Sequence, residues 1–191
     1  MKRGRPAAAS REDVLAAGLY RYLRGQRVDV QSLAAELGLG RTTIYRWFGS
    51  RDRLIGDVIV RAVEPVLDEA RAEARGKGGH ALLDTFDRIN RSFAASPALR
   101  SFVDQERETA MRITTSGSGV VRPYIVSRIR AWIEEEVESG AYEAPVDPAT
   151  LAYAIVRLAE AFIYNDTGPG VRSDVDRLRE VEAALLGIRL S

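Results

Sequence analysis

The apolar positions of this chain recur at intervals of three and four residues, and this spacing predicts helices along its whole length. No segment alternates apolar and polar residues for the length of a strand, so we expect an all-α fold. Glycine, proline and capping residues divide the pattern into about nine helices. Their expected ranges are 11–24, 30–37, 41–48, 51–75, 80–95, 97–113, 121–139, 148–167 and 174–190.

Several helix starts are marked by capping chemistry. The run from Ser10 to Asp13 resembles a capping box, in which two side chains satisfy free backbone N–H groups. Asp29 and Ser50 are expected to cap the second and fourth helices, and Ser173 the last. Asp147 precedes Pro148, and proline is favoured at the first position of a helix.

Residues 29–48 have the pattern of a helix-turn-helix. Two short helices that pack across a tight turn need apolar anchors, a small residue at their closest approach and a turn residue that tolerates a left-handed backbone. The anchors are Leu33, Leu37, Leu39 and Ile44, the small residue is Ala34, and the turn residue is Gly38.

The second of these helices leaves polar and aromatic residues for its outer face: Arg41, Thr42, Thr43, Tyr45, Arg46 and Trp47. Arginine can read guanine with two hydrogen bonds, and the threonine methyl can contact thymine. Tyrosine and threonine hydroxyls can bind phosphates. A solvated surface helix would not explain two aromatic residues beside two arginines, so the pattern predicts binding to double-stranded DNA.

The charge distribution agrees with this interpretation. Residues 1–61 have a net charge of +6 and the remainder −5, within a total of +1. A basic head on an acidic body indicates that the head meets the polyanion. Lys2, Arg3 and Arg5 form a short basic arm, which either reaches an adjacent minor groove or remains a solvated tail.

Composition excludes some other functions. The chain has no cysteine, which excludes disulfides and thiolate sites and is compatible with the cytoplasm. The one histidine, His80, belongs to no recognisable catalytic motif, and no phosphate-binding glycine loop or metal-ligand spacing is present. We therefore expect neither an enzyme nor a bound metal or cofactor. No apolar run is long enough to span a membrane.

The residues from Leu33 to Leu39, followed by those from Thr43 to Asp52, closely resemble the signature of the TetR family of repressors. The resemblance covers residues 10 to about 60. It implies a DNA-binding domain over 1–49 and a helical regulatory and dimerisation domain over 50–191. It implies base contacts from Arg41, Thr42, Thr43 and Arg46, and phosphate contacts from Tyr45, Trp47 and Arg51, with Gln31 as a further candidate. Trp47 departs from the pattern, because histidine is commonest there.

The last two predicted helices are candidates for a dimer interface. The first is apolar on nearly all sides, and the second has apolar residues spaced three, four and three, as in a coiled coil. Both could instead pack within one subunit, but the resemblance implies that they pair with their twins. The expected interface residues are Leu151, Ile155, Leu158, Phe162, Leu178, Val181, Leu185 and Ile188.

The middle helices carry aromatic residues with polar groups nearby, a combination typical of ligand cavities and also of an ordinary core. The candidate ligand-binding residues are Phe86, Asn90, Phe93, Phe102, Glu106, Met111, Tyr124 and Asn165. The stretch from Phe102 to Glu108 has a faint similarity to regulators of lactone degradation.

Together these observations predict a homodimeric repressor that a small, partly apolar effector releases from a palindromic operator. The alternative is a dimeric DNA-binding factor without a small-molecule ligand. A cavity in the body would favour the first, and a body filled by side chains the second.

Overall fold

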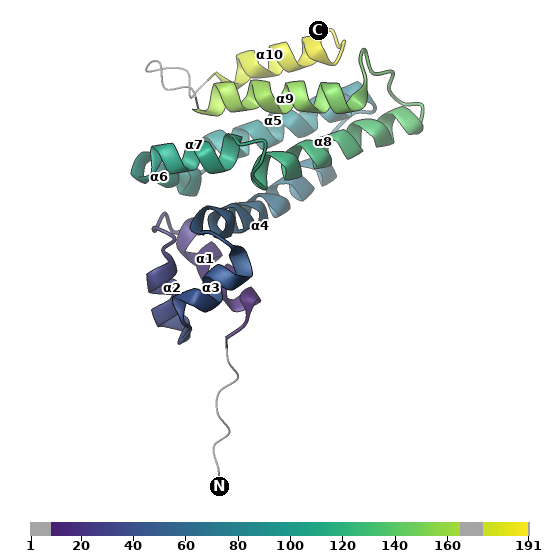
Figure 1. The fold of residues 1–191 in the computed structure, drawn as a ribbon. Helices are drawn as coiled ribbons and strands as arrows, with labels where there is room; N and C mark the ends of the chain where they lie inside the picture. The colour runs from purple at the N-terminus through teal and green to yellow at the C-terminus, as the bar shows by residue number, and fades with distance from the viewer. Residues whose placement is uncertain (1–8, 165–173, 191) are drawn as a thin grey trace.

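The computed structural model describes residues 9–164 and 174–190. The regular elements of these two ranges are all helices, as Figure 1 shows, and the predicted all-α class is confirmed. The ten helices of the described residues are α1 (Arg11–Leu23), α2 (Val30–Leu37), α3 (Arg41–Phe48), α4 (Arg51–Ala72), α5 (Gly79–Ala95), α6 (Pro97–Gln105), α7 (Arg107–Thr115), α8 (Val121–Glu138), α9 (Pro148–Tyr164) and α10 (Val175–Leu185).

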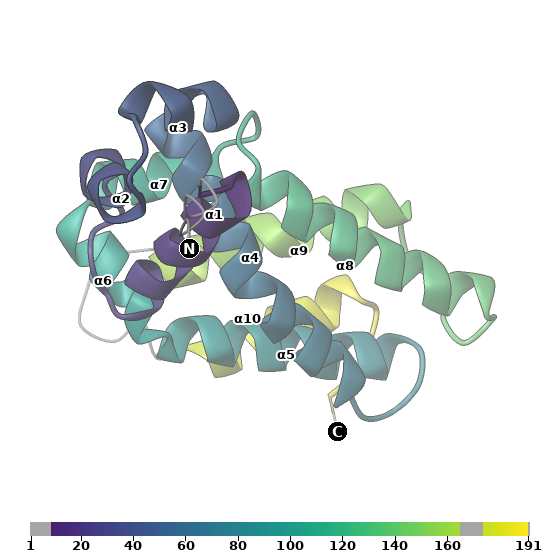
Figure 2. The same ribbon diagram turned by 90° about the horizontal axis from the view of Figure 1, so that it is seen from below.

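Helices α1–α3 form a small head at one end of the molecule, and α5–α10 form a larger body (Figure 1). Helix α4 belongs to both, because it packs against α1 in the head and against α5, α7 and α8 in the body. Seen from below, α4 crosses from the head towards α5 (Figure 2). The head is therefore joined to the body by one continuous helix of 22 residues.

The predicted caps hold the head helices in place. Ser10 and Asp13 form the expected capping box, with the Ser10 N–H donating to the Asp13 carboxylate at 2.7 Å. Asp29 accepts a hydrogen bond from the Ser32 N–H at 2.9 Å, and Ser50 accepts one from the Arg53 N–H at 3.1 Å. Each bond satisfies a backbone donor that the first turn of a helix leaves free.

The body differs from the sequence-based expectation at residues 97–113. The apolar spacing predicts one helix there, whereas the structure has α6 and α7, separated at Glu106. Glu106 has φ −141° and ψ 52°, outside the helical region. Its carboxylate binds Arg51 of α4 with two hydrogen bonds of 2.7 Å, a tertiary contact that periodicity does not report.

Two apolar clusters form the core. The first joins α1–α3 and the first half of α4 to Ala98, Ile113 and Val121 of the body. The second joins the second half of α4 to α5, α8, α9 and α10. The first cluster thus continues across the predicted domain boundary at residues 49 and 50. No helix within the described ranges is long and apolar enough to cross a membrane.

The last helix is shorter than its pattern predicts, because it ends at Leu185 and not near Leu190. Its predicted cap, Ser173, lies outside the described residues, as do the basic arm of Lys2, Arg3 and Arg5 and the candidate ligand residue Asn165.

Candidate nucleic-acid interface and effector cavity

The turn between α2 and α3 has the predicted chemistry. Gly38 has φ +64° and ψ 29°, a left-handed conformation that costs glycine least. The Leu39 N–H donates to the Ala34 carbonyl at 2.9 Å and closes the end of α2. Ala34, Leu33 and Ile44 are buried, and Leu37 and Leu39 are partly buried against the same core. The two helices therefore pack as a helix-turn-helix.

Helix α3 turns its polar face to the solvent. Arg41, Thr42, Tyr45 and Arg46 are exposed, and Thr43 is half-buried. Among the residues that the structure describes, neither guanidinium of α3 takes part in an ion pair, although most arginines of the head and body are paired with carboxylates. Trp47 instead packs partly against the core of the head. The exposed face of α3 is thus cationic and open to a ligand.

The two other predicted DNA contacts lie beside this helix. Gln31 is exposed in the first turn of α2. Arg51, at the start of α4, donates to the Val28 carbonyl at 3.0 Å and to both carboxylate oxygens of Glu106 at 2.7 Å. The hydrogen bonds from Arg51 hold the pKa of Glu106 below its usual range. Arg51 therefore links the head to the body in this structure.

The corner between α6 and α7 makes further contacts with the head, including an ion pair of 3.3 Å between Arg27 and Glu106. The Gln105 side chain donates to the Gly25 carbonyl at 2.8 Å, and the ring of Phe102 lies edge-on to Tyr22 with centroids 6.1 Å apart. The stretch from Phe102 to Glu106 is therefore part of a head–body junction. We call residues 102–106 with Arg51 the junction.

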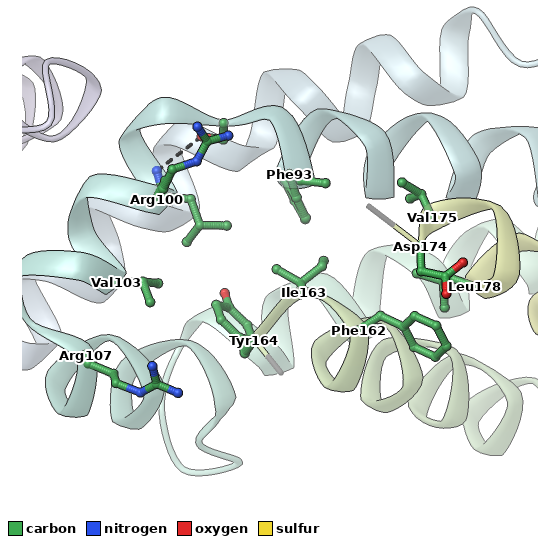
Figure 3. A pocket seen from close by; sticks show the side chains of 13 residues that line it. Phe93, Arg100, Val103, Arg107, Phe162, Ile163, Tyr164, Asp174, Val175 and Leu178 are labelled. Carbon is green, nitrogen blue, oxygen red and sulfur yellow. Dashed lines mark hydrogen bonds between the residues drawn. The ribbon is translucent and has the colours of Figure 1, made fainter. Parts of the chain in front are cut away.

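The body contains two adjoining cavities that share Phe93, Ile163 and Tyr164. The inner cavity is lined by Phe86, Ile89, Asn90, Phe93, Thr114, Val121, Ile125, Ile129, Ile155, Val156, Ala159, Glu160, Ile163, Tyr164 and Glu182. The outer cavity is lined by Phe93, Ala94, Ser96, Leu99, Arg100, Val103, Arg107, Phe162, Ile163, Tyr164, Asp174, Val175 and Leu178. Figure 3 shows the outer cavity, with Phe93, Ile163 and Tyr164 grouped around one space.

Each cavity has a volume of about 50 Å³. That volume holds a few water molecules and is too small for a drug-sized ligand. A ligand of that size must therefore push the surrounding helices apart, and α5, α6, α7, α8, α9 and α10 all contribute lining residues to one cavity or the other.

Of the seven predicted ligand residues that the structure describes, three line the inner cavity and four line neither cavity. Phe86, Asn90 and Phe93 line the inner cavity. Phe102 and Glu106 lie at the junction, and the Tyr124 hydroxyl donates to Glu64 on the surface at 3.2 Å. Met111 is half-buried on α7 and lines neither cavity. Their aromatic and polar character does not distinguish a cavity wall from an ordinary core.

Several polar residues of the inner cavity are not among the ligand-binding residues predicted from the sequence. Glu182 is fully buried, and the Asn90 amide donates to its two carboxylate oxygens at 2.9 and 3.1 Å. Glu160 accepts two hydrogen bonds from buried Arg122, at 2.7 and 2.8 Å. One signal was available, because Glu182 lies four residues after Leu178 and three before Leu185, on an otherwise apolar face.

The inner cavity is connected to α4 through one residue of its wall, Val121. Val121 lines the cavity and packs against Gly56, where a Cβ atom would lie 3.9 Å from Val121 Cγ2 and 2.6 Å from Val120 Cγ2. Glycine thus allows the start of α8 to approach α4 closely. A displacement of this part of α8 would act directly on the helix that carries the head.

The predicted dimer residues also divide into two groups. Leu151, Ile155 and Leu178 are each 1% exposed and are covered by their own subunit. Val181 is 42% exposed, and Leu158, Phe162, Leu185 and Ile188 are half-buried. Helices α9 and α10 lie side by side at the end of the body away from α2 and α3 (Figure 1). These five residues remain the candidates for contact with a partner.

The head, the linking helix and the cavity-bearing body are together the architecture of ligand-responsive, DNA-binding transcription regulators. The family model of the tetracyclin repressor-like C-terminal domain matches residues 77–187. The chain therefore belongs to the TetR family of transcription regulators, and the family resemblance is confirmed.

Solved structures of TetR-family repressors have the same fold. The transcriptional repressor QsdR of R. erythropolis is 27% identical, with a TM-score of 0.87 over 95% of this chain and 96% of that one. The repressor AlkX of Dietzia sp. strain DQ12-45-1b, implicated in biodegradation of n-alkanes, is 22% identical, with a TM-score of 0.65 over 98% of both chains. No curated protein sequence matches this chain.

Proposed function

We propose that this protein is a homodimeric repressor that binds a palindromic operator through α3 and is released by a small, partly apolar effector. It acts on DNA in the cytoplasm and catalyses no reaction. The observation that carries the proposal is the pair Arg41 and Arg46, which are exposed on α3 and form no ion pair with any residue that the structure describes. They lie on a helix-turn-helix whose turn and core have the required chemistry. Similarity to the repressor QsdR supports repression of transcription as opposed to activation.

In this proposal Arg41, Thr42, Thr43 and Arg46 contact bases, and Gln31, Tyr45, Trp47 and the start of α4 at Arg51 contact phosphates. Two α3 helices related by a two-fold axis then read half-sites about 34–36 Å apart. Leu158 and Phe162 of α9, Val181 and Leu185 of α10, and Ile188 just after α10 contact the partner subunit. The head over residues 1–49 supplies DNA binding, and residues 50–191 supply regulation and dimerisation.

Release follows from the small volume of the cavities. An effector too large for about 50 Å³ binds best to a body whose helices have moved apart. Movement of α8 acts on Gly56 of α4, and movement of α6 acts on Arg51 through Glu106. Both contacts connect the cavities to the head, so effector binding changes the separation of the two α3 helices. The effector shifts the equilibrium only by its differential affinity for the two forms.

Selection of bound fragments from random double-stranded DNA tests the proposal. We expect a two-fold symmetric site with half-sites separated by one helical turn, bound by the dimer. A matched selection with Arg41→Ala/Arg46→Ala should enrich no such site. Enrichment of the same site by this variant, or no enriched site with the unaltered protein, would refute the assignment of α3.

A further inference from the structure

Glu182 is an unusual residue for the wall of an apolar cavity. Its side chain comes from α10, is fully buried, and faces a space lined largely by phenylalanine, isoleucine and valine. Its partner is Asn90 of α5, whose one amide nitrogen donates to both carboxyl oxygens at 2.9 and 3.1 Å. Among the described residues, no arginine, lysine or histidine forms an ion pair with it.

Glu160, on the opposite side of the same cavity, has a different environment. Arg122 binds it with two hydrogen bonds, and Arg157 lies 3.3 Å away, so its charge is compensated. Glu182 has no such cation in the part of the chain that the structure describes, and burial raises its pKa to about 8. Its carboxyl group is therefore mainly protonated at neutral pH, and it carries an O–H donor inside the cavity.

A neutral carboxyl group can recognise a hydrogen-bond acceptor. In the neutral form, one oxygen of Glu182 accepts from the Asn90 amide and the other carries the O–H, which can donate to another molecule. Ketone, ester and amide oxygens are acceptors of this kind, and the rest of the wall suits an apolar chain. A ligand without an acceptor would leave this donor unsatisfied, which is costly in a buried site.

We propose that the effector is a neutral molecule with an apolar chain and a carbonyl group, and that Glu182 donates a hydrogen bond to the carbonyl oxygen while Asn90 orients the carboxyl. This inference names the ligand class of the cavity and rests on the proposed function. An amine, bound as an ammonium ion, would instead pair with the ionised form of Glu182, and the test below distinguishes these two ligand classes.

The charges around Glu182 also favour its neutral form. On α5, Asp87 opposes ionisation, although its own carboxylate binds Arg91 at 2.9 Å. On α9, Glu160 is paired with Arg122 of α8, and burial raises the pKa of Tyr164 to about 12, so that this phenol stays neutral. Thr114 of α7 adds only a hydroxyl.

The test is calorimetric titration of the dimer, without DNA. The three probes, 2-heptanone, heptylamine and heptane, share an unbranched chain of seven carbon atoms. The proteins are the unaltered chain, Glu182→Gln, Glu182→Leu and the control Glu134→Gln, which changes a glutamate on the surface of α8. Glutamine keeps a donor at position 182, and leucine removes it. Circular dichroism verifies that each variant is folded.

At pH 6.5 we expect 2-heptanone to bind most tightly, and heptane and heptylamine about 10-fold more weakly. Glu182→Gln should retain the ketone affinity within about threefold, and Glu182→Leu should lose about 10-fold. At pH 9.5 the unaltered protein should bind the ketone at least about 10-fold more weakly, because Glu182 is then ionised, whereas Glu182→Gln should not change. Glu134→Gln should behave as the unaltered protein.

The inference is overturned if heptylamine binds better than the ketone, if the ketone binds no better than heptane, or if no probe binds. An unchanged ketone affinity at pH 9.5 would also overturn it, and that measurement needs only the unaltered protein. This titration contains no DNA, so its result does not depend on operator binding. A failure to bind an operator would refute the proposed function but would not change the calorimetric result.

Discussion

The face of α3 and the wall of the inner cavity hold their polar side chains in opposite ways. Helix α3 exposes two guanidinium groups without a carboxylate partner among the described residues. The inner cavity buries Glu182, which forms no ion pair with a cation in the described ranges 9–164 and 174–190. The first arrangement suits a fixed polyanion in water, and the second suits a small ligand that brings one polar group into an apolar site. DNA binding by α3 should therefore depend on salt, and ligand binding in the inner cavity should depend on pH.

The largest expected effect concerns salt and operator affinity. If about six phosphates are contacted by the dimer, the affinity should fall about 10³-fold between 50 and 200 mM salt, because bound counterions are released. Fluorescence anisotropy of a labelled operator measures this slope. A salt-independent affinity would contradict the phosphate contacts of the head.

The second prediction concerns the dimer that brings two heads together. Val181→Asp places a charge on an apolar residue of α10 that is 42% exposed, and we expect the dimer dissociation constant to rise about 100-fold. Val146→Asp is a matched control, because Val146 is 50% exposed in the segment before α9. Analytical ultracentrifugation measures both. An equal effect of the two substitutions would remove α10 from the proposed interface.

The third prediction concerns the stability of the cavity wall. The pKa of Glu182 is raised by burial, so the folded protein keeps a proton that the unfolded chain releases above pH 4.5. Stability conferred by this group is therefore lost as pH rises from about 4.5 to about 8. Relative to the unaltered protein, Glu182→Gln should gain about 4 kcal/mol in the free energy of unfolding over that range.

Denaturant unfolding of both proteins at one concentration, at pH 5 and pH 8, measures this difference. Glu134→Gln serves as the control on the surface of α8. A parallel pH dependence of the unaltered protein and Glu182→Gln would show that the carboxyl group stays ionised in the cavity.

The smallest expected effect is at the contact between cavity and head. Gly56→Ala places a Cβ atom 2.6 Å from Val120 Cγ2, and the overpacking should cost about 1 kcal/mol of stability. Gly117→Ala is the control, because the nearest atom there is 4.0 Å away. Thermal unfolding measures both, and no difference between them would show that α8 can move without affecting α4.

The head could be predicted from sequence because each of its features is local. Gly38 supplies the turn, Asp29 and Ser50 supply caps, and the exposed residues of α3 are what the apolar anchors leave over. Helix α3 has the predicted bounds Arg41–Phe48. Short-range spacing and side-chain chemistry are sufficient to place these residues.

The body could be predicted only as a set of helices. Phenylalanine at helical spacing looks the same in a cavity wall, as for Phe86, and at a junction, as for Phe102. Glu106 pairs with Arg51, 55 residues away, and Asn90 with Glu182, 92 residues away. Such contacts depend on tertiary packing, and they decide where the helix breaks and which polar groups face the cavity.

The central claim is that α3 reads DNA, and the operator affinity of Arg46→Ala tests it most directly. Arg130→Ala is the matched control, an exposed arginine on α8 that pairs with Glu134. At fixed salt we expect Arg46→Ala to weaken operator binding by about 10- to 100-fold, with unchanged unfolding and dimerisation, and Arg130→Ala to have no effect. Equal affinity of Arg46→Ala and the unaltered protein would contradict the account.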